Sequence, residues 1–208
     1  MKKRKIEQTP LEKELIRYVE ALHAEDTSGH DFFHIQRVVQ MAKHLAKKQN
    51  IDNKKLLLLS YLHDVDDPKM VGNSQGSSRA LDIMKTCKIE EVLAFNIQSE
   101  ISKMSYSAHQ AGSRVESIEA KIVQDSDRLD AIGAIGIARA FTYGGSKRRV
   151  MFEGSFNDET SIAHFYRKLL HLEQLMNTKQ AKKIAKKRTK LMRKYLKAFH
   201  EEWSIITK

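Results

Sequence analysis

Cysteine, proline, glycine and long apolar runs are all scarce in this chain. Its 208 residues include a single cysteine, Cys87, so no disulfide can form within the chain. Only two prolines and nine glycines are present, and this scarcity favours long helices over sheets with many turns. No apolar stretch approaches the roughly 20 residues that a membrane-spanning helix needs. These absences exclude a disulfide-stabilised fold and favour a helical one.

Acidic residues are also in deficit, with 26 of them against 37 basic ones and a net charge of +11. Such an excess indicates an anionic partner, which includes nucleotides, nucleic acids and membrane surfaces. Much of it lies in residues 1–5 and in the last third of the chain. No apolar segment follows the basic residues 1–5, so they do not resemble a secretory signal. We therefore expect a cytoplasmic protein that does not associate with membranes.

The apolar spacing predicts one all-α domain over residues 1–208, with a core over about 11–176 and a basic helix over about 178–204. Thr9, Pro10 and Glu12 are typical of a helix start. The helices expected after this first one cover about 31–49, Asp52 through the leucine run, 78–87, 89–103, 117–143 with an interruption near Asp130, 158–176 and 178–203. Loops are expected over 105–113 and 147–157.

Ionisable residues follow directly after an apolar run in the middle of the chain. The leucines at 56–59 lead into His63, Asp64 and two further aspartates. Burying such groups is costly unless something compensates them, and a bound metal ion does so. Neighbouring residues on a helix point about 100° apart. Because Pro68 follows closely, the pair lies near a helix end, where both side chains can reach one ion beyond or across the last turn.

The chain offers further metal ligands on either side of this pair. His34 lies upstream in HDFFHIQRV, and Asp127 lies downstream in DSDRLD. Imidazole suits transition metals, and carboxylate suits harder ions such as Mn²⁺ and Mg²⁺. Four protein ligands leave octahedral positions open for water and a substrate oxygen, which is the chemistry of phosphate-ester or phosphoanhydride hydrolysis. A lone histidine is more often structural, and it is the ordered set that predicts a metal site.

Three segments resemble the HD superfamily of metal-dependent phosphohydrolases. Residues 34–38, HIQRV, resemble its first histidine motif, and Leu62-His63-Asp64 resembles its central doublet. Residues 122–136, IVQDSDRLDAIGAIG, resemble a branch of small bacterial HD-domain hydrolases, some of which are nucleoside triphosphate pyrophosphohydrolases. The resemblance runs from about Leu11 to Gly145 and more loosely to Met176.

The resemblance implies an HD-domain helical bundle in which His34, His63, Asp64 and Asp127 bind one divalent ion. Mn²⁺ is expected, with Fe²⁺, Co²⁺, Ni²⁺, Zn²⁺ or Mg²⁺ as alternatives. A second ion is not expected, because only His109 lies between the doublet and the last aspartate. The implied reaction converts a (deoxy)nucleoside triphosphate to the monophosphate and pyrophosphate. The alternatives are a nucleotide 5'-phosphomonoesterase and a catalytically silent module that binds nucleotides or nucleic acid.

Charged residues just after the doublet are candidates for catalysis. Asp67, with Asp66 as its alternative, can orient or deprotonate the attacking water. Lys69 can assist there and can hold a phosphate as a point charge. The competing interpretation for each residue is a solvated loop with a local ion pair.

Two more charged residues share helix faces with expected ligands. Asp130 lies one turn after Asp127, where it can orient a ligating histidine or contact a ribose hydroxyl of the substrate. Arg37 lies one turn after His34, where it can clamp a substrate phosphate or pair with a buried aspartate. Both residues are therefore candidates for substrate binding.

Lysines and arginines crowd the expected helix over 178–204, interleaved with the apolar residues Ile184, Leu191, Tyr195 and Leu196. We interpret this segment as a packed amphipathic helix with a solvated basic face. Nucleic-acid binding is the less favoured alternative. No zinc-finger, phosphate-loop or RNA-binding signature accompanies the charges, so a small nucleotide is the expected partner.

Overall fold

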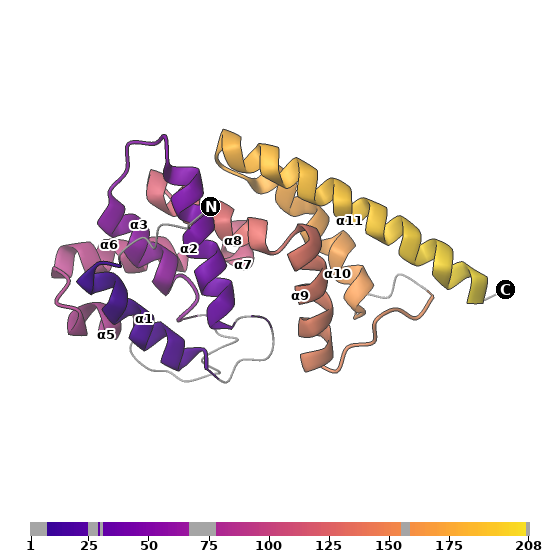
Figure 1. Ribbon diagram of the computed structural model, residues 1–208, viewed down its shortest axis with the longest axis horizontal. Helices are drawn as coiled ribbons and strands as arrows, with labels where there is room; N and C mark the ends of the chain where they lie inside the picture. The colour runs from indigo at the N-terminus through magenta and orange to yellow at the C-terminus, as the bar shows by residue number, and fades with distance from the viewer. Residues whose placement is uncertain (1–7, 25–28, 30, 67–77, 155–158, 207–208) are drawn as a thin grey trace, which may run out of the picture. The chain divides into compact units, whose positions relative to one another are not determined.

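The computed structural model describes residues 8–24, 29, 31–66, 78–154 and 159–206 (Figure 1). Within these ranges the regular structure is helical and no strand occurs, which confirms the expected all-α fold. None of the helices in this part of the chain combines the length and apolarity that crossing a bilayer requires. The chain divides into two compact units, the first formed by residues 1–25 and 51–120 and the second by residues 26–50 and 121–208.

Four of the five helices described in the first unit begin at side-chain caps. Its elements are α1 (Pro10–Leu22), α3 (Asn53–Leu62), α5 (Arg79–Thr86), α6 (Glu91–Ser102) and α7 (Tyr106–Gln110). Thr9, Asp52, Ser78 and Ser105 accept backbone N–H groups at the starts of α1, α3, α5 and α7, which satisfies donors that the first turn leaves unpaired. The helix α7 corrects the prediction of a loop over 105–113, because Ser105 caps one short helix there.

Apolar side chains hold the first unit together. The helix α3 packs against α1 and α6, and α5 packs against α6. Leu15 and Val19 of α1, Leu58 and Leu59 of α3, and Ile97 of α6 have no exposed surface. This packing buries the second half of α3 through its last residue, so the core fixes the position of His63 directly after the helix.

The second unit contains the remaining helices. Its elements are α2 (Phe32–Ala46), α8 (Ile118–Asp130), which begins at the end of the first unit, α9 (Gly133–Ser146), α10 (Ser161–Arg167), the 3₁₀ helix η1 (Leu169–Leu175) and α11 (Lys179–Ile206). The helices α9 and η1 each pack against both α10 and α11. Residues 158–176, predicted as one helix, instead form α10 and η1, with a break at Lys168 where φ is −131°.

The predicted interruption near Asp130 is present between α8 and α9. Ile132 is extended, and Gly133 has a φ of +80°, a conformation that suits glycine. A Cβ atom at Gly133 would lie 2.9 Å from Cγ of Arg188. The glycine therefore makes the turn and also leaves room for an arginine that reaches in from α11.

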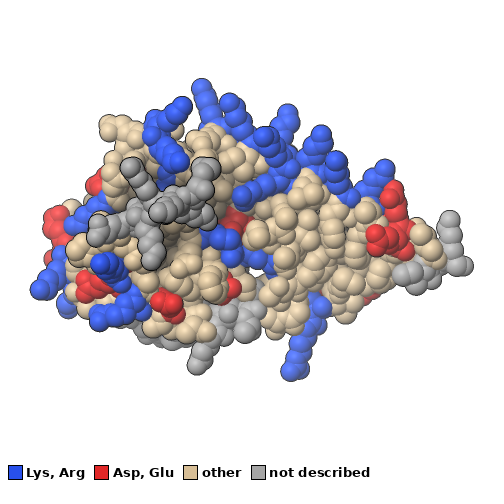
Figure 2. All heavy atoms as spheres, in the orientation of Figure 1, with Lys and Arg blue, Asp and Glu red and all other residues tan. Residues whose placement is uncertain are grey.

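The helix α11 is attached to α8 through a buried carboxylate. Asp125 has no exposed surface, and it accepts the backbone N–H groups of Asn177 at 2.7 Å and Thr178 at 2.8 Å. Burial raises the pKa of Asp125, and these hydrogen bonds partly offset the shift. The predicted basic helix is present as α11, whose buried face includes Ala185 and Met192. Lysine and arginine side chains form a row along this helix on the face that Figure 2 shows.

Candidate metal centre

In the second unit, His34 is held on two sides by carboxylates. Its helix, α2, begins at Asp31, whose side chain accepts the His34 backbone N–H at 2.8 Å. The imidazole is fully buried, and its Nδ1 lies 2.8 Å from Oδ2 of Asp130. Its Nε2 lies 3.5 Å from Oδ1 of Asp127. Because an ionised carboxylate only accepts hydrogen bonds, Nδ1 carries a proton, and Nε2 is the ring nitrogen that faces Asp127.

In the first unit, His63 and Asp64 repeat this arrangement. His63 lies directly after α3 and donates from Nδ1 to the carbonyl oxygen of Ser60 at 3.0 Å. Its Nε2 lies 3.6 Å from Oδ2 of Asp64. Both residues occupy the turn that follows Leu62, as the sequence predicts for a pair that reaches one ion beyond the end of a helix.

The donor chemistry of both pairs suits a metal ion. In both pairs the histidine nitrogen and the carboxylate oxygen lie 3.5 to 3.6 Å apart, farther than a normal hydrogen bond, and both atoms can bind one cation placed near them. Nitrogen and oxygen ligands bound at about 2.1 Å to one ion lie roughly 3 to 3.5 Å apart. His34 and His63 are buried, whereas 40% of the Asp127 side chain is exposed, so water reaches this ligand.

Asp130 joins one expected ligand to two arginines. Its Oδ1 accepts from Nε of Arg37 at 2.8 Å, and its Oδ2 accepts from Nη2 of Arg37 at 3.0 Å and from Nη1 of Arg139 at 2.8 Å. Burial works against the charge of Asp130, but the hydrogen bonds from His34 and Arg37 and the charge of Arg139 hold its pKa far below the usual range. The carboxylate is therefore ionised whenever the protein is folded at ordinary pH.

These contacts bear on two expected substrate-binding residues. Asp130 makes the hydrogen bond that a residue orienting a histidine ligand must make. Arg37 makes the ion pair with a buried aspartate that the sequence allows as its second role. Contacts of Asp130 with a ribose and of Arg37 with a phosphate stay predictions. Arg139 could not be predicted from the sequence, because a helix break separates it from Asp130 and the spacing of the two residues gives no signal.

Asp66, an expected catalytic residue, uses both carboxylate oxygens inside the first unit. It accepts from Oγ of Ser78 at 2.5 Å, from the backbone N–H of Arg79 at 2.7 Å and from Nε2 of Gln98 at 3.1 Å. These bonds hold the start of α5 against α6 and favour a structural role for Asp66. The other two catalytic candidates, Asp67 and Lys69, lie outside the described residues.

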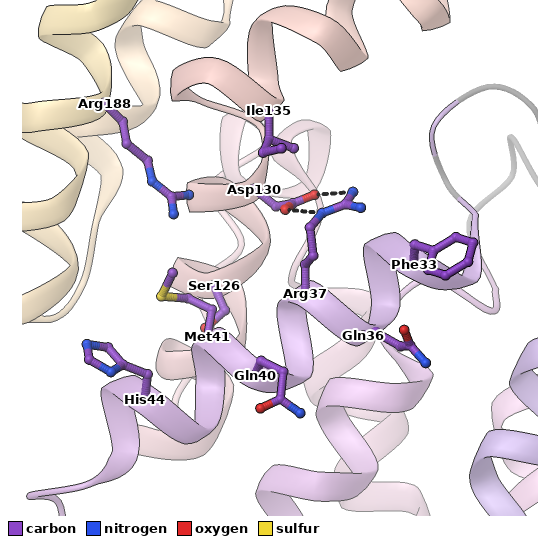
Figure 3. A pocket seen from close by; sticks show the side chains of 10 residues that line it. All are labelled: Phe33, Gln36, Arg37, Gln40, Met41, His44, Ser126, Asp130, Ile135 and Arg188. Atoms are coloured by element: carbon purple, nitrogen blue, oxygen red, sulfur yellow. Dashed lines mark hydrogen bonds and ion pairs between the residues drawn. The ribbon is translucent and has the colours of Figure 1, made fainter. Parts of the chain in front are cut away.

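A cavity of about 700 Å³ opens in the second unit beside Asp130 (Figure 3). Phe33, Arg37, Met41 and His44 line it from α2, and Arg188 lines it from α11. Arg188 is therefore an exception to the prediction that the basic residues of this helix face solvent. Its guanidinium turns inward, and its Nη1 donates to the carbonyl oxygen of Leu129 at 2.5 Å. Burial lowers the pKa of Arg188, while the charge of Asp130 acts in the opposite direction.

Comparison with known proteins shows the same architecture in bacterial relatives. The family model described as the HD domain matches residues 32–132, a range that includes His34, His63, Asp64 and Asp127. The uncharacterized protein YpgQ of Bacillus subtilis is 34% identical over 188 residues, which are 89% of this chain and 90% of YpgQ. A crystal structure of YpgQ in complex with ADP matches 92% of this chain and 97% of its own, with a TM-score of 0.76.

Two further crystal structures extend the likeness. A protein of Lactobacillus plantarum is 32% identical and has a TM-score of 0.83, with 96% of this chain and 100% of that chain covered. An HD-superfamily hydrolase of Bacillus thuringiensis is 37% identical and has a TM-score of 0.72, with 93% and 96% covered. In each case nearly the whole of both chains takes part in the match.

Proposed function

The chain belongs to the HD superfamily of metal-dependent phosphohydrolases, and from this membership we propose that it hydrolyses (deoxy)nucleoside triphosphates to monophosphates and pyrophosphate. One observation carries the proposal. A histidine whose Nδ1 is hydrogen-bonded to an acceptor directs Nε2 at a carboxylate oxygen, and this arrangement is found in each unit, at His34 and at His63.

The ligands of the proposed ion are His34 and Asp127 from the second unit and His63 and Asp64 from the first. Their mixed nitrogen and oxygen atoms suit Mn²⁺ and also admit Fe²⁺, Co²⁺, Ni²⁺, Zn²⁺ or Mg²⁺. A bound ion of this kind supplies Lewis-acid chemistry, which polarises a phosphoryl oxygen and acidifies water.

Other groups of the protein orient the two histidines, the attacking water and the substrate. Asp130 and the carbonyl of Ser60 hold the Nδ1 protons of the two histidines, so each Nε2 keeps its lone pair for a ligand. Asp67 orients the attacking water and accepts its proton. Lys69 neutralises a phosphate of the substrate.

The nucleotide substrate is supported by the relatives and by the charge of the chain. YpgQ, at 34% identity, crystallises in complex with ADP. The net charge of +11 favours an anionic substrate. A nucleotide 5'-phosphomonoesterase is the alternative reaction. The presence of all four expected ligands disfavours a catalytically silent module.

A substrate panel tests this proposal directly. The purified chain is incubated with (deoxy)nucleoside triphosphates and monophosphates and with each divalent ion in turn, and phosphate and pyrophosphate are measured separately. Release of pyrophosphate from triphosphates, strongest with Mn²⁺, supports the proposal. Release of phosphate from monophosphates alone would establish the alternative reaction. Loss of all release with every ion would contradict both.

A further inference from the structure

Basic side chains line the cavity in the second unit. Two guanidinium groups line it, from Arg37 and Arg188, together with one carboxylate, from Asp130. Arg37 and Arg139 already pair with that carboxylate. Arg188 forms no ion pair among the described residues, and the Asp130 charge that acts on it is already paired with two other arginines, so positive charge is in excess at the cavity wall. Guanidinium groups in such positions bind phosphate through charge-assisted hydrogen bonds.

The remaining lining favours a ligand with a planar organic part. Phe33 is 67% exposed at one end of the cavity, and Met41 and Ile135 add apolar surface. Gln36 and Gln40 present side-chain amides, which both donate and accept hydrogen bonds. Figure 3 places Phe33 at the opposite end from Arg188 and His44. An aromatic side chain at one end of the cavity, the Arg188 guanidinium at the other and side-chain amides along the wall match a base and its phosphates.

The dimensions agree with such a ligand. A volume of about 700 Å³ lies within the usual range for small-molecule sites. Phe33 and His44 lie roughly 16 Å apart along the axis of α2, because each helical residue rises 1.5 Å. This span accommodates a base, a sugar and phosphates in an extended arrangement.

The cavity lies on the opposite side of His34 from its expected metal-binding atom. Asp130 lines the cavity and contacts Nδ1, whereas neither His34 nor Asp127 belongs to the lining. The two ring nitrogens of an imidazole point away from each other. A ligand in the cavity is therefore separated from Nε2 of His34 by the Asp130 carboxylate.

We propose that this cavity is a second nucleotide site, distinct from the metal centre, which binds a nucleoside phosphate without a metal ion. Its phosphate lies against Arg188 and its base against Phe33. The bound ligand also contacts Arg37, which pairs with the Asp130 carboxylate, and this carboxylate orients His34. Occupation of the cavity therefore changes the affinity of the metal centre for its ion. This last coupling rests on the proposed function, whereas the binding itself does not.

Calorimetric titration of the full chain in EDTA, with AMP, ADP, adenosine and inorganic phosphate as probes, tests the site. We expect saturable 1:1 binding of AMP and ADP, with adenosine and phosphate each weaker. Arg188→Gln and Gln40→Glu should each weaken ADP binding about tenfold or more, because one removes a cation and the other adds a like charge. Gln40 is exposed, so its variant leaves the core intact. The matched controls are Lys187→Gln on the exposed face of α11 and Gln49→Glu just beyond α2, and both should stay within twofold.

His63→Ala separates this proposal from the proposed function. The variant removes an expected metal ligand of the first unit, so it should abolish hydrolysis and leave metal-free ADP binding unchanged. Loss of ADP binding in His63→Ala would place the nucleotide at the metal centre and overturn the second site. Absence of saturable binding to the wild-type chain in EDTA, or equal affinity of Arg188→Gln and Lys187→Gln, would also overturn it. Persistent metal-free binding alongside a failed substrate panel would leave the second site standing alone.

Discussion

Nδ1 of His34 and Oδ2 of Asp130 lie 2.8 Å apart, although 96 positions separate the two residues in the chain. The hydrogen bond fixes which ring nitrogen carries the proton. It connects a buried histidine to a carboxylate that two arginines keep ionised. The orientation of His34 therefore depends on α2, α8 and α9 together.

Asp130→Asn should weaken metal binding by about 10- to 100-fold, the usual effect of losing a group that orients a histidine ligand. The amide oxygen of asparagine can still accept the hydrogen bond from Nδ1, but the side chain carries no charge to balance Arg37 and Arg139. Titration with Mn²⁺ measures the affinity, and Asp82→Asn on the exposed surface of α5 is the control. Equal affinity of the two variants would show that Asp130 does not support the ligand.

Asp67→Asn should lower turnover by about 10²–10⁴-fold, the usual order for a general base. Metal affinity should change much less, because the proposed role of Asp67 is on the water. Steady-state kinetics and Mn²⁺ titration of the same preparation separate the two effects. Unchanged kinetics would transfer the role to another group.

Replacing Lys182, Lys183, Lys186 and Lys187 with glutamine should leave kcat/KM for a small nucleotide nearly unchanged. These side chains are exposed on α11, and salt screens their charges over about 8 Å at physiological ionic strength. If the chain binds nucleic acid through the basic row in Figure 2, the same replacements should weaken that binding and reduce its dependence on salt, because both arise from contacts with phosphates. A large rise in KM for the small nucleotide would assign these lysines to the substrate site.

Glu100→Gln should destabilise the first unit at neutral pH. The buried carboxylate accepts the backbone N–H groups of Glu116 at 3.0 Å and Ser117 at 2.8 Å. Burial raises the pKa of Glu100, but these hydrogen bonds outweigh burial and leave its pKa lowered. A lowered folded pKa contributes stability above the unfolded value of about 4.3, and this contribution disappears as the pH falls through the folded pKa.

Urea unfolding of wild type and Glu100→Gln at several pH values measures this contribution. The difference in midpoint should be largest at pH 7 and should shrink below about pH 4. Glu90→Gln, an exposed change at the start of α6, is the control. A difference that stays constant with pH would mean that the charge of Glu100 contributes nothing.

Local signals predicted the helices well, because caps and apolar spacing act within a few residues. Thr9, Asp52 and Ser78 start helices where expected, and the chain breaks beside Asp130. The division of residues 158–176 into α10 and η1 could not be predicted in the same way. These two helices pack against α9 and α11, and such contacts between distant segments leave no local pattern in the sequence.

The expected site residues show the same division between local and distant effects. The order of His34, His63, Asp64 and Asp127 is visible in the sequence. The donors around Asp66 come from Ser78, Arg79 and Gln98, and only the folded chain brings these groups together. For the same reason, the sequence could not show that the Arg188 side chain points inward while the neighbouring lysines are exposed to solvent.

We propose that His34 and His63 bind the same ion. Elemental analysis after loading with Mn²⁺ and desalting tests it on wild type, His34→Ala, His63→Ala and the exposed control His171→Ala. We predict close to one ion per chain in wild type and His171→Ala, and almost none in either of the other variants, with helical circular dichroism preserved in all four. Full occupancy in His34→Ala or in His63→Ala would contradict the shared metal centre.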